Sequence, residues 1–395
     1  MVRIIRILTG LKAVNFLLGA VIFSIFVRIA PVFPFEVTKM KFLIVLILTS
    51  LSFAQVLAKQ VDGLYDAQVV VNDQSAQARK EGAKKGLMDV LHKVSGFPVP
   101  IEHPVVFRAL NIADQYLYQF SFARLEESEW GPDAPPGSSY LNMRFEGKSI
   151  QRIIRQAQLP RWGANRPTIM TWVAVDDGQR QILTDTSEHK ALSKLNKAAK
   201  KRGLPLVLPI YDLEDSIKLP MVQLWGLFKE GVLNASERYG AESILAGRIY
   251  QPDEESWLGN WRFYFKGQEF EYEFRSQTLD EQMLWGLSAG AKVLADAYAL
   301  KPSTEKQTGL LANIRKVNTL EDYGHLLKYL NKLAITKQVS LIKMSGSDVL
   351  LNLSLNGTLD QLMQTLSLDK KIVAVAVSSE DVDQNQSMSQ FIWRP

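Results

Sequence analysis

Strand-like and helix-like segments alternate through the middle of the chain, and their order restricts the folds it can adopt. Short apolar runs rich in β-branched and aromatic residues are typical of strands, whereas apolar residues repeating every three to four positions are typical of helices. The expected strands lie at 168–175, 204–209, 243–250, 261–265 and 270–274, and the expected helices at 187–202, 222–239 and 279–300. This order predicts a mixed sheet with helices packed against it.

The preceding part of the chain has a shorter pattern of the same kind. Ser75 is suited to cap a helix, and Ser95-Gly96 ends that helix before Pro98. The expected strands are 64–71, 118–123 and 140–145, and the expected helices are 76–95, 104–119 and 149–158. Residues 59–160 are therefore expected to form a first α/β lobe, and residues 161–300 a second.

The C-terminal part has the pattern of a small separate module. Residues 301–309 are polar, contain Pro302 and are expected to be a linker. Residues 310–377 follow the order βαββαβ, which is ferredoxin-like, and residues 378–395 are expected to be a polar, mobile tail. The sequence thus predicts an α/β (α+β) protein of two mixed α/β lobes and a C-terminal ferredoxin-like βαββαβ module.

Residues 40–58 have the pattern of a secretory signal peptide. Lys41 supplies a positive charge, residues 42–53 an apolar segment, and Val56-Leu57-Ala58 a small-residue cleavage site. Cleavage after Ala58 would release a chain that begins at Lys59 and has no cysteine to carry lipid, and hence no stable membrane anchor. The pattern predicts a periplasmic protein.

A second apolar run, at 13–27, precedes this leader and leaves two interpretations. The run is shorter than the ~20 residues that a spanning helix needs, and the signal peptide starting at Met40 is complete by itself. This favours residues 1–39 as a start-site artefact. The alternative is that residues 1–39 are translated and retained, which would anchor the protein in the inner membrane.

Charge and cysteine content exclude several classes of function. Six of the 46 basic residues and one of the 41 acidic residues lie in positions 1–58, so the rest of the chain is formally neutral. Nucleic-acid binding requires an excess of positive charge, which this part lacks. The chain has no cysteine and four scattered histidines without metal-site spacing. We therefore expect no cofactor, no metal and no nucleic-acid partner.

Catalytic motifs give no assignment either. Residues 286–290 match the G-x-S-x-G pattern of a nucleophile elbow. That motif needs a strand leading into the turn, whereas these residues lie within an expected helix. No residue is assigned as catalytic, and an enzyme is the less favoured interpretation.

An acidic group follows the expected strand at 204–209. Asp212 and Asp215 stand beyond the carboxyl end of that strand, where α/β sheets bind ligands. They are candidate binding residues for this reason. The alternative, which is the favoured interpretation, is structural, with Asp215 capping a helix and Glu214 as a solvated loop charge.

Four lysines form a basic stripe along one face of the expected helix at 187–202. The stripe is suited to bind the phosphate groups of a lipid or an acidic partner. The alternative is an ordinary solvated helix face, which the neutral charge of the body favours. The four candidate residues are Lys190, Lys194, Lys197 and Lys201.

The loop between the two lobes holds the densest group of polar and aromatic residues. Arg161, Trp162, Asn165 and Arg166 are suited to bind an anion, a sugar or a protein anchor. The alternative is a rigid connector, in which Gly163 permits a tight turn and the side chains tie the two lobes together. The connector is the favoured interpretation.

Several segments of the chain resemble a family of exported Gram-negative bacterial proteins, the domain-of-unknown-function family 2066. The resemblance covers most of residues 60–300 and implies no activity. The matching segments are 61–67, 75–79, 94–96, 162–167, 202–206, 212–215 and 235–241. A weaker likeness, at residues 238–248, is to periplasmic modules of envelope assembly factors, and it implies protein binding.

These observations favour a soluble periplasmic, non-catalytic binding or assembly factor of the cell envelope, with an envelope protein as partner. The alternative is a periplasmic enzyme acting on envelope glycan or phosphate groups through Asp212 and Asp215 with Arg161 or Arg166. The two hypotheses differ in one geometric requirement, because the enzyme needs these four residues to converge in a single pocket.

Overall fold

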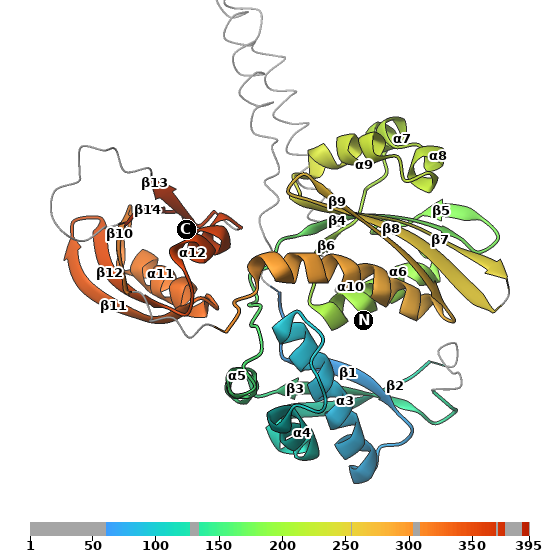
Figure 1. Cartoon of the computed structure of the whole chain (residues 1–395), viewed down its shortest axis with the longest axis horizontal. Coiled ribbons are helices and arrows are strands. Elements are labelled where there is room, and N and C mark those ends of the chain that lie inside the picture. The colour runs from blue at the N-terminus through green and yellow to red at the C-terminus, as the bar shows by residue number, and fades with distance from the viewer. Residues whose placement is uncertain are drawn as a thin grey trace, which may run out of the picture. The chain divides into compact units, whose positions relative to one another are not determined.

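The computed structural model describes residues 61–126, 134–253, 255–302, 309–368, 370–375 and 389–394 (Figure 1). These residues form three sheets, all of them combined with helices. The expected signal peptide and residues 1–39 lie outside the described residues. None of the helices in the described ranges is long and apolar enough to be a candidate membrane span.

The first lobe is a three-stranded antiparallel sheet with helices against it. The order of its strands is β1-β3-β2. Its elements are β1 (Asp66–Val71), α3 (Ala76–Ser95), α4 (Pro104–Asn111), β2 (Leu117–Arg124), β3 (Ser139–Phe145) and α5 (Gly147–Gln156). The helix expected at 104–119 is shorter, because Leu117 and Gln119 already pair with β3.

Helix α3 is the long helix that the sequence predicted, and local chemistry fixes both of its ends. The Ser75 side chain accepts a hydrogen bond from the Ala78 N–H, and Gly96 follows the helix in the left-handed conformation, with φ 80°. The helix also lies close to the sheet, since a Cβ added at Gly82 would come within 2.7 Å of Leu141. A side chain at this position would push α3 away from β3.

The second lobe contains a larger mixed sheet of order β5-β4-β7-β8-β9, with the short β6 paired to β4. Strand β4 runs parallel to β6 and β7, whereas β7, β8 and β9 are antiparallel. The elements are β4 (Ile169–Asp176), β5 (Arg180–Ile182), α6 (Lys190–Arg202), β6 (Leu206–Val207), α7 (Leu213–Lys218), α8 (Met221–Trp225), α9 (Lys229–Ser236), β7 (Ser243–Asp253), β8 (Ser256–Phe265), β9 (Gln268–Ser276) and α10 (Leu279–Tyr298). The mixed sheet with helices against it is confirmed.

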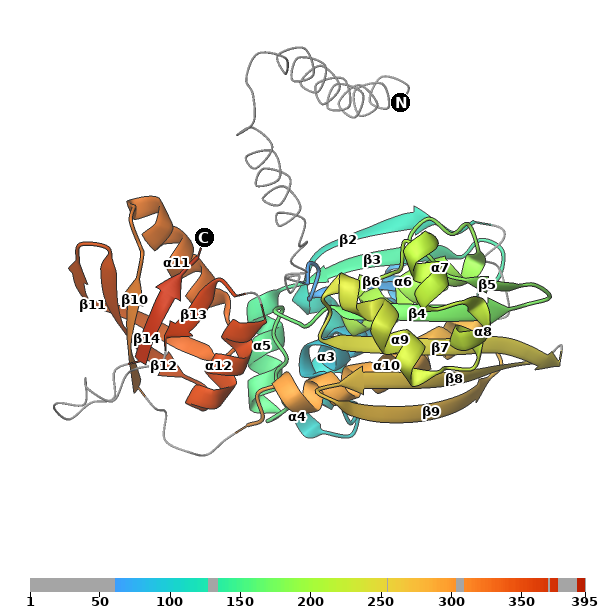
Figure 2. The ribbon, with the colours of Figure 1, turned by 90° about the horizontal axis from the view of Figure 1, so that it is seen from above.

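Helices cover both faces of this sheet and make the second lobe a three-layer structure (Figure 2). Alternate residues of β4 point to opposite sides, so that Val173 lies in the core with α6 and α10, and Trp172 in the core with α8 and α9. All residues from Ile169 to Val175 are consequently buried. Burial on both faces explains why this strand has an almost continuous apolar sequence.

The single helix expected at 222–239 is wrong. The chain forms α8, which ends at Trp225, and starts α9 at Lys229, with Leu227 between them in the left-handed conformation at φ 52°. This backbone conformation is unfavourable for a residue with a side chain. It is retained because Leu227 is 5% exposed and packs in the core below α8 and α9.

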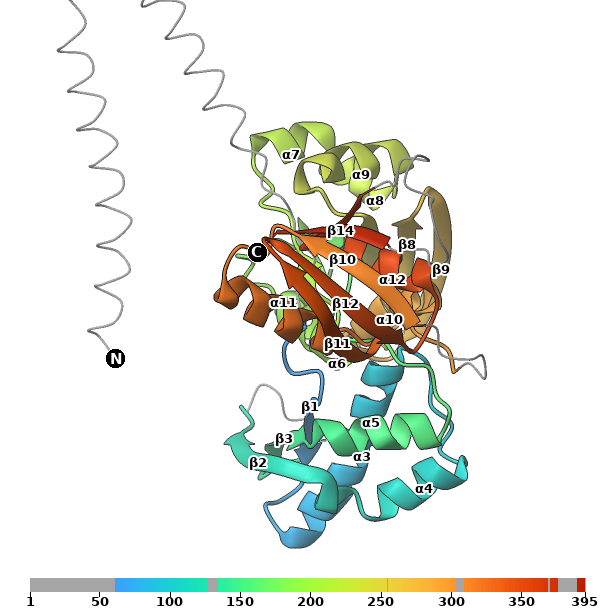
Figure 3. The ribbon, with the colours of Figure 1, turned by 90° about the vertical axis from the view of Figure 1, so that its left-hand side faces the viewer.

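The C-terminal module has the expected βαββαβ order with one strand added (Figure 3). Its sheet has the order β11-β12-β10-β14-β13, in which β14 lies parallel to β10 and antiparallel to β13. The elements are β10 (Gly309–Arg315), α11 (Leu320–Lys332), β11 (Thr336–Ser345), β12 (Asp348–Leu355), α12 (Leu359–Ser367), β13 (Ile372–Val375) and β14 (Ser389–Trp393). Strand β14 thus inserts between the first and last strands of the unit.

Part of the expected mobile tail forms this added strand. Phe391 and Trp393 are 2% and 3% exposed and pack in the core of the module. Burying two aromatic side chains offsets the entropy cost of ordering a short segment. The part of the tail at 378–388 lies outside the described residues.

Candidate functional site

The loop between the lobes, expected as a connector or a binding site, makes contacts inside the protein. Trp162 is 1% exposed, and its backbone N–H donates to the carbonyl of Val94 in α3 at 2.7 Å. The Asn165 side-chain amide donates to the carbonyl of Thr365 in α12 at 3.2 Å. The loop therefore contacts both the first lobe and the C-terminal module.

Arg166 is fully buried and lies between the two lobes. Its guanidinium lies 4.0 Å from the centre of the Trp162 ring, and its five N–H groups donate five hydrogen bonds of 2.6–3.1 Å to backbone carbonyls. The acceptors belong to Lys93, Trp162, Gly163, Arg202 and Gly203. Burial lowers the pKa of Arg166 to about 9, so the side chain is charged at neutral pH. Arg166 is a structural tie and presents no donor to a ligand.

Arg161 has a similar structural position at the start of the loop. Its backbone N–H and carbonyl pair with those of Leu300, just after α10, and both hydrogen bonds are 2.9 Å long. Burial lowers the pKa of the Arg161 side chain. The loop at 161–166 thus has the geometry of a connector.

A second buried cation lies close to Arg166. Lys93 is 6% exposed, and its ammonium group donates to the carbonyls of Asp66 at 2.7 Å and Gly63 at 3.4 Å. Burial, followed by repulsion from the Arg166 charge, lowers the pKa of Lys93 to about 8. The proton on this residue is therefore held less tightly in the folded state than in the unfolded chain.

We expect Lys93 to make the protein more stable as the pH rises. Between its folded pKa of about 8 and its unfolded value of about 10.4, the unfolded state binds more protons, so the free energy of unfolding increases with pH. Lys93→Met should remove this increase between about pH 8 and 10, as measured by urea unfolding. Lys85→Met, at an exposed position of the same helix, is the control. Equal slopes in wild type and Lys93→Met would contradict this assignment.

The basic stripe of α6 is engaged within the chain. Its ammonium groups contact acidic or hydroxyl groups, and two of these partners, Asp89 and Tyr140, belong to the first lobe. The pairs are Lys190–Asp177 (3.2 Å), Lys194–Asp280 (2.8 Å), Lys197–Tyr140 (3.4 Å) and Lys201–Asp89 (3.2 Å). From the sequence, the stripe was expected to contact an external partner or water. Its internal partners were missed because helix spacing cannot identify residues so distant in the sequence.

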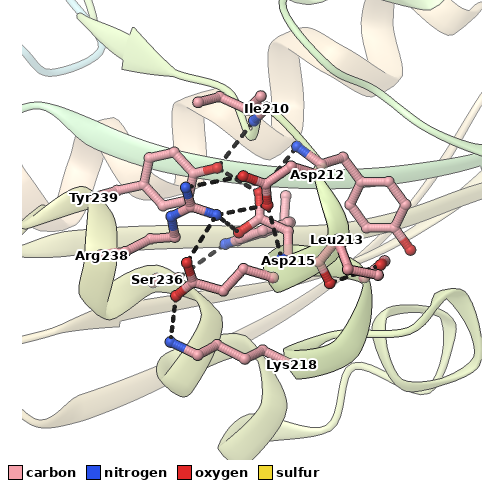
Figure 4. A network of polar contacts seen from close by, with 12 residues as sticks. Ile210, Asp212, Leu213, Asp215, Lys218, Ser236, Arg238 and Tyr239 are labelled. Atoms are coloured by element: carbon pink, nitrogen blue, oxygen red, sulfur yellow. Dashed lines mark hydrogen bonds and ion pairs between the residues drawn. The ribbon is translucent and has the colours of Figure 1, made fainter. Parts of the chain in front are cut away.

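Asp212 and Asp215 belong to a polar network on the outer side of the second lobe (Figure 4). Asp212, not Asp215, is the helix cap, because its carboxylate accepts a hydrogen bond from the Asp215 N–H at 3.1 Å. The Asp215 side chain is completely buried. It accepts hydrogen bonds from the Tyr239 hydroxyl at 2.5 Å, the Tyr211 N–H at 2.9 Å and the Arg238 guanidinium at 3.1 Å.

Arg238 and Tyr239 complete this network from a turn beyond α9. Arg238 binds both oxygens of Asp212, at 2.7 and 3.1 Å, and these hydrogen bonds raise the pKa of Arg238 and lower the pKa of Asp212. Burial, and then the hydrogen bond to Asp215, raises the pKa of Tyr239 to about 12. Neither residue was predicted to have a role from the sequence, although both lie in segment 235–241 of the resemblance.

The four residues of the enzyme hypothesis are engaged in separate structural roles. Asp212 and Asp215 both accept hydrogen bonds from Arg238, and Asp212 also accepts one from the Asp215 N–H. Arg166 uses all its donors on backbone carbonyls, including those of Lys93 in α3 and Arg202 in α6, and Arg161 pairs through its backbone with Leu300. The G-x-S-x-G segment lies within α10, as its helical pattern predicted. Among the residues that the structure describes, no group of three or more His, Asp or Glu side chains is placed to hold a metal ion.

The segment that carries this network also exposes a set of large apolar side chains. Leu213 and Ile217 lie one turn apart on α7, and the other three come from the ends of neighbouring elements. We call these residues the α7–α9 face: Ile210, Leu213, Ile217, Val222 and Phe228, which are 58–76% exposed. The inner side of the same helices packs Leu219, Leu224 and Val232 into the core. The helical layer is therefore apolar on both sides.

A comparison with known protein families gives a match in the N-terminal part of the chain. Residues 58–163 match a domain of unknown function, DUF8605. This finding corrects the resemblance to family 2066, because the matching domain is a different one. The match includes the first lobe and the beginning of the connector loop, and it carries no description of an activity.

Two solved structures resemble parts of the chain. The competence-damaged protein (CinA) superfamily protein from Escherichia coli is 14% identical, over 38% of this chain and 83% of its own length, with a TM-score of 0.19. An uncharacterized protein is 11% identical, over 33% of this chain and 91% of its own length, with a TM-score of 0.16. Superpositions this poor support no functional argument. No curated protein matches the sequence.

Proposed function

We propose that this protein is exported to the periplasm and acts there as a non-catalytic binding or assembly factor of the cell envelope. In this proposal an envelope protein docks on the α7–α9 face. The observation that carries it is the exposure of five large apolar side chains, each more than half exposed, within residues 210–228. Large apolar groups gathered on a surface mark interaction sites, because their exposure to water is unfavourable.

The polar network below the face supports a docking role. Arg238 and Asp215 connect the turn after α9 to α7, and the Tyr239 hydroxyl accepts a hydrogen bond from the Ile210 N–H at 2.9 Å. The backbone that presents Ile210 and Leu213 is therefore fixed before a partner arrives. A preorganised surface loses less conformational entropy on binding, which favours affinity.

The charge around the face favours a protein partner over a lipid surface. Residues 210–239 include five acidic and three basic residues, and the side chains of Asp212 and Glu214 are 42% and 50% exposed. Helices that lie on anionic membranes carry Lys and Arg around their apolar side, which is the opposite pattern. We expect a partner with apolar anchors surrounded by basic groups.

The leader pattern supports the location. Residues 40–58 combine a positive start, an apolar segment and a cleavage site, and the chain after Ala58 carries no cysteine for a lipid anchor. If residues 1–39 are retained as an inner-membrane anchor, the proposed release into the periplasm is wrong.

Photocrosslinking in intact cells tests the proposal. With a photoreactive amino acid in place of Ile217, irradiation should give a discrete adduct with one protein in the periplasmic fraction, and the crosslinked chain should begin at Lys59. The same substitution at Leu320, which is 83% exposed on α11, is the control and should give no such adduct. Equal adducts from both positions, adducts with lipid, or a cytosolic chain that retains its leader would contradict the proposal.

A further inference from the structure

A cleft of about 660 Å³ lies in the second lobe at the carboxyl ends of two parallel strands. Strands β4 and β7 pair in parallel up to Asp176 and Tyr250, which are both in the cleft wall. Helix α8 packs against the same two strands and contributes Trp225 (Figure 1). Ligands of α/β sheets bind beyond the carboxyl ends of parallel strands, and the volume suits a small molecule.

The charged groups of the cleft leave one arginine without an acidic partner. The lining carboxylates are already paired: Asp176 with Arg180 (2.9 Å), Asp177 with Lys190 (3.2 Å) and Asp253 with Arg275 (3.3 Å). Arg248 is half-buried and donates to two neutral groups, the Asn260 side-chain oxygen at 3.0 Å and the Trp225 carbonyl at 3.2 Å. Within the described part of the chain, Arg248 forms no ion pair and its Nη2 group makes no hydrogen bond.

Two aromatic rings line the same cleft as Arg248. The rings of Trp225 and Tyr250 are 6.0 Å apart and inclined at 51°, and both belong to the cleft wall. Arg180 lies 4.2 Å from the centre of the Trp225 ring, and its Nε, not a terminal nitrogen, donates a hydrogen bond to Asp176. The cleft thus combines guanidinium groups, suited to the paired oxygens of an anion, with flat apolar surface.

We infer that this cleft binds a small oxyanion, a carboxylate or a phosphate, carried on a sugar-sized ring. Arg248 holds the anion from the middle of β7, and Arg180 contacts it from the start of β5. Trp225 and Tyr250 pack against the ring. Asp176 orients Arg180, and all three lining carboxylates are neutralised by basic partners, which reduces their repulsion of the ligand. This inference is independent of docking on the α7–α9 face.

Titration calorimetry on the exported chain tests the inference with four probes. Glucose 6-phosphate and glucuronate represent the phosphate and the carboxylate, glucose lacks the anion, and inorganic phosphate lacks the ring. At least one anionic sugar should bind and glucose should not. Arg248→Gln should weaken binding about tenfold or more, because a bidentate charged contact is lost. Trp225→Leu should weaken binding of the anionic sugar more than that of inorganic phosphate.

Two further variants serve as a control and as a substitute for Arg248→Gln. Arg108→Gln, at an exposed arginine of α4 in the first lobe, should leave the affinity within about twofold. If Arg248→Gln does not fold, Arg180→Gln replaces a side chain that is 53% exposed and should still reduce the affinity severalfold. Failure of both anionic sugars to bind, or binding that neither arginine variant weakens, would overturn the inference. Crosslinking from Ile217 tests docking separately, so the two ideas can fail independently.

Discussion

Replacing Arg166 with alanine is expected to lower the free energy of unfolding by about 3–5 kcal/mol. The substitution removes a fully buried cation and leaves five backbone carbonyls without their donors. Two of the acceptors, Lys93 and Arg202, belong to different lobes. The loss should therefore weaken the contact between the lobes as well as the loop itself.

Urea unfolding of three variants measures this effect. Arg166→Lys retains the charge but cannot reach five acceptors, so we expect an intermediate loss. Arg152→Ala, at an exposed position on α5, should change the free energy of unfolding by less than about 0.5 kcal/mol. If Arg166→Ala were as stable as Arg152→Ala, the five hydrogen bonds would have no net role in holding the lobes together.

The second large effect is expected at Asp215. Asp215→Ala should cost about 3 kcal/mol, because the Tyr239 hydroxyl and the Tyr211 N–H lose a buried charged acceptor and Arg238 loses a partner. The change should affect α7–α9 before the rest of the second lobe, since all the lost contacts lie in this layer.

Hydrogen exchange followed by mass spectrometry distinguishes a local from a global effect. We expect faster exchange over residues 210–239 in Asp215→Ala, with β4 and α10 still protected. Glu214→Ala is the matched control, because its carboxylate is exposed and its ion pairs with Lys218 at 2.9 Å and Arg238 at 3.6 Å are surface contacts that contribute little. Uniformly faster exchange across the second lobe, or no change over 210–239, would show that the network does not brace this layer.

Much of the fold could be predicted because residues that become buried form local apolar patterns in the sequence. The apolar run at 168–175 became β4, which is covered on both faces. The capping residues around α3 marked both of its ends. The βαββαβ order of the C-terminal module also followed from local patterns. Strand β14 could not be predicted, because it forms through pairing with β10 and β13 and through packing of Phe391 and Trp393 in the module's core, all of which depend on tertiary structure.

The contacts of the candidate site residues, in contrast, could not be predicted from the sequence. The sequence marked Asp212 and Asp215, but their partners Arg238 and Tyr239 lie beyond two helices and a left-handed residue at Leu227. Arg166 was a binding candidate because it belongs to the densest group of polar and aromatic residues on an expected loop. Its five carbonyl partners could not be foreseen, since backbone acceptors are present everywhere in a sequence and only tertiary structure selects among them.

The docking of another protein on the α7–α9 face is the central claim, and the yield of the Ile217 adduct in intact cells tests it most directly. Leu213→Asp places a charge one helical turn away and should reduce that yield about tenfold. Leu320→Asp, on the C-terminal module, should leave it unchanged. If the Ile217 adduct formed equally well with Leu213→Asp in a correctly folded chain, the α7–α9 face would not be the docking surface.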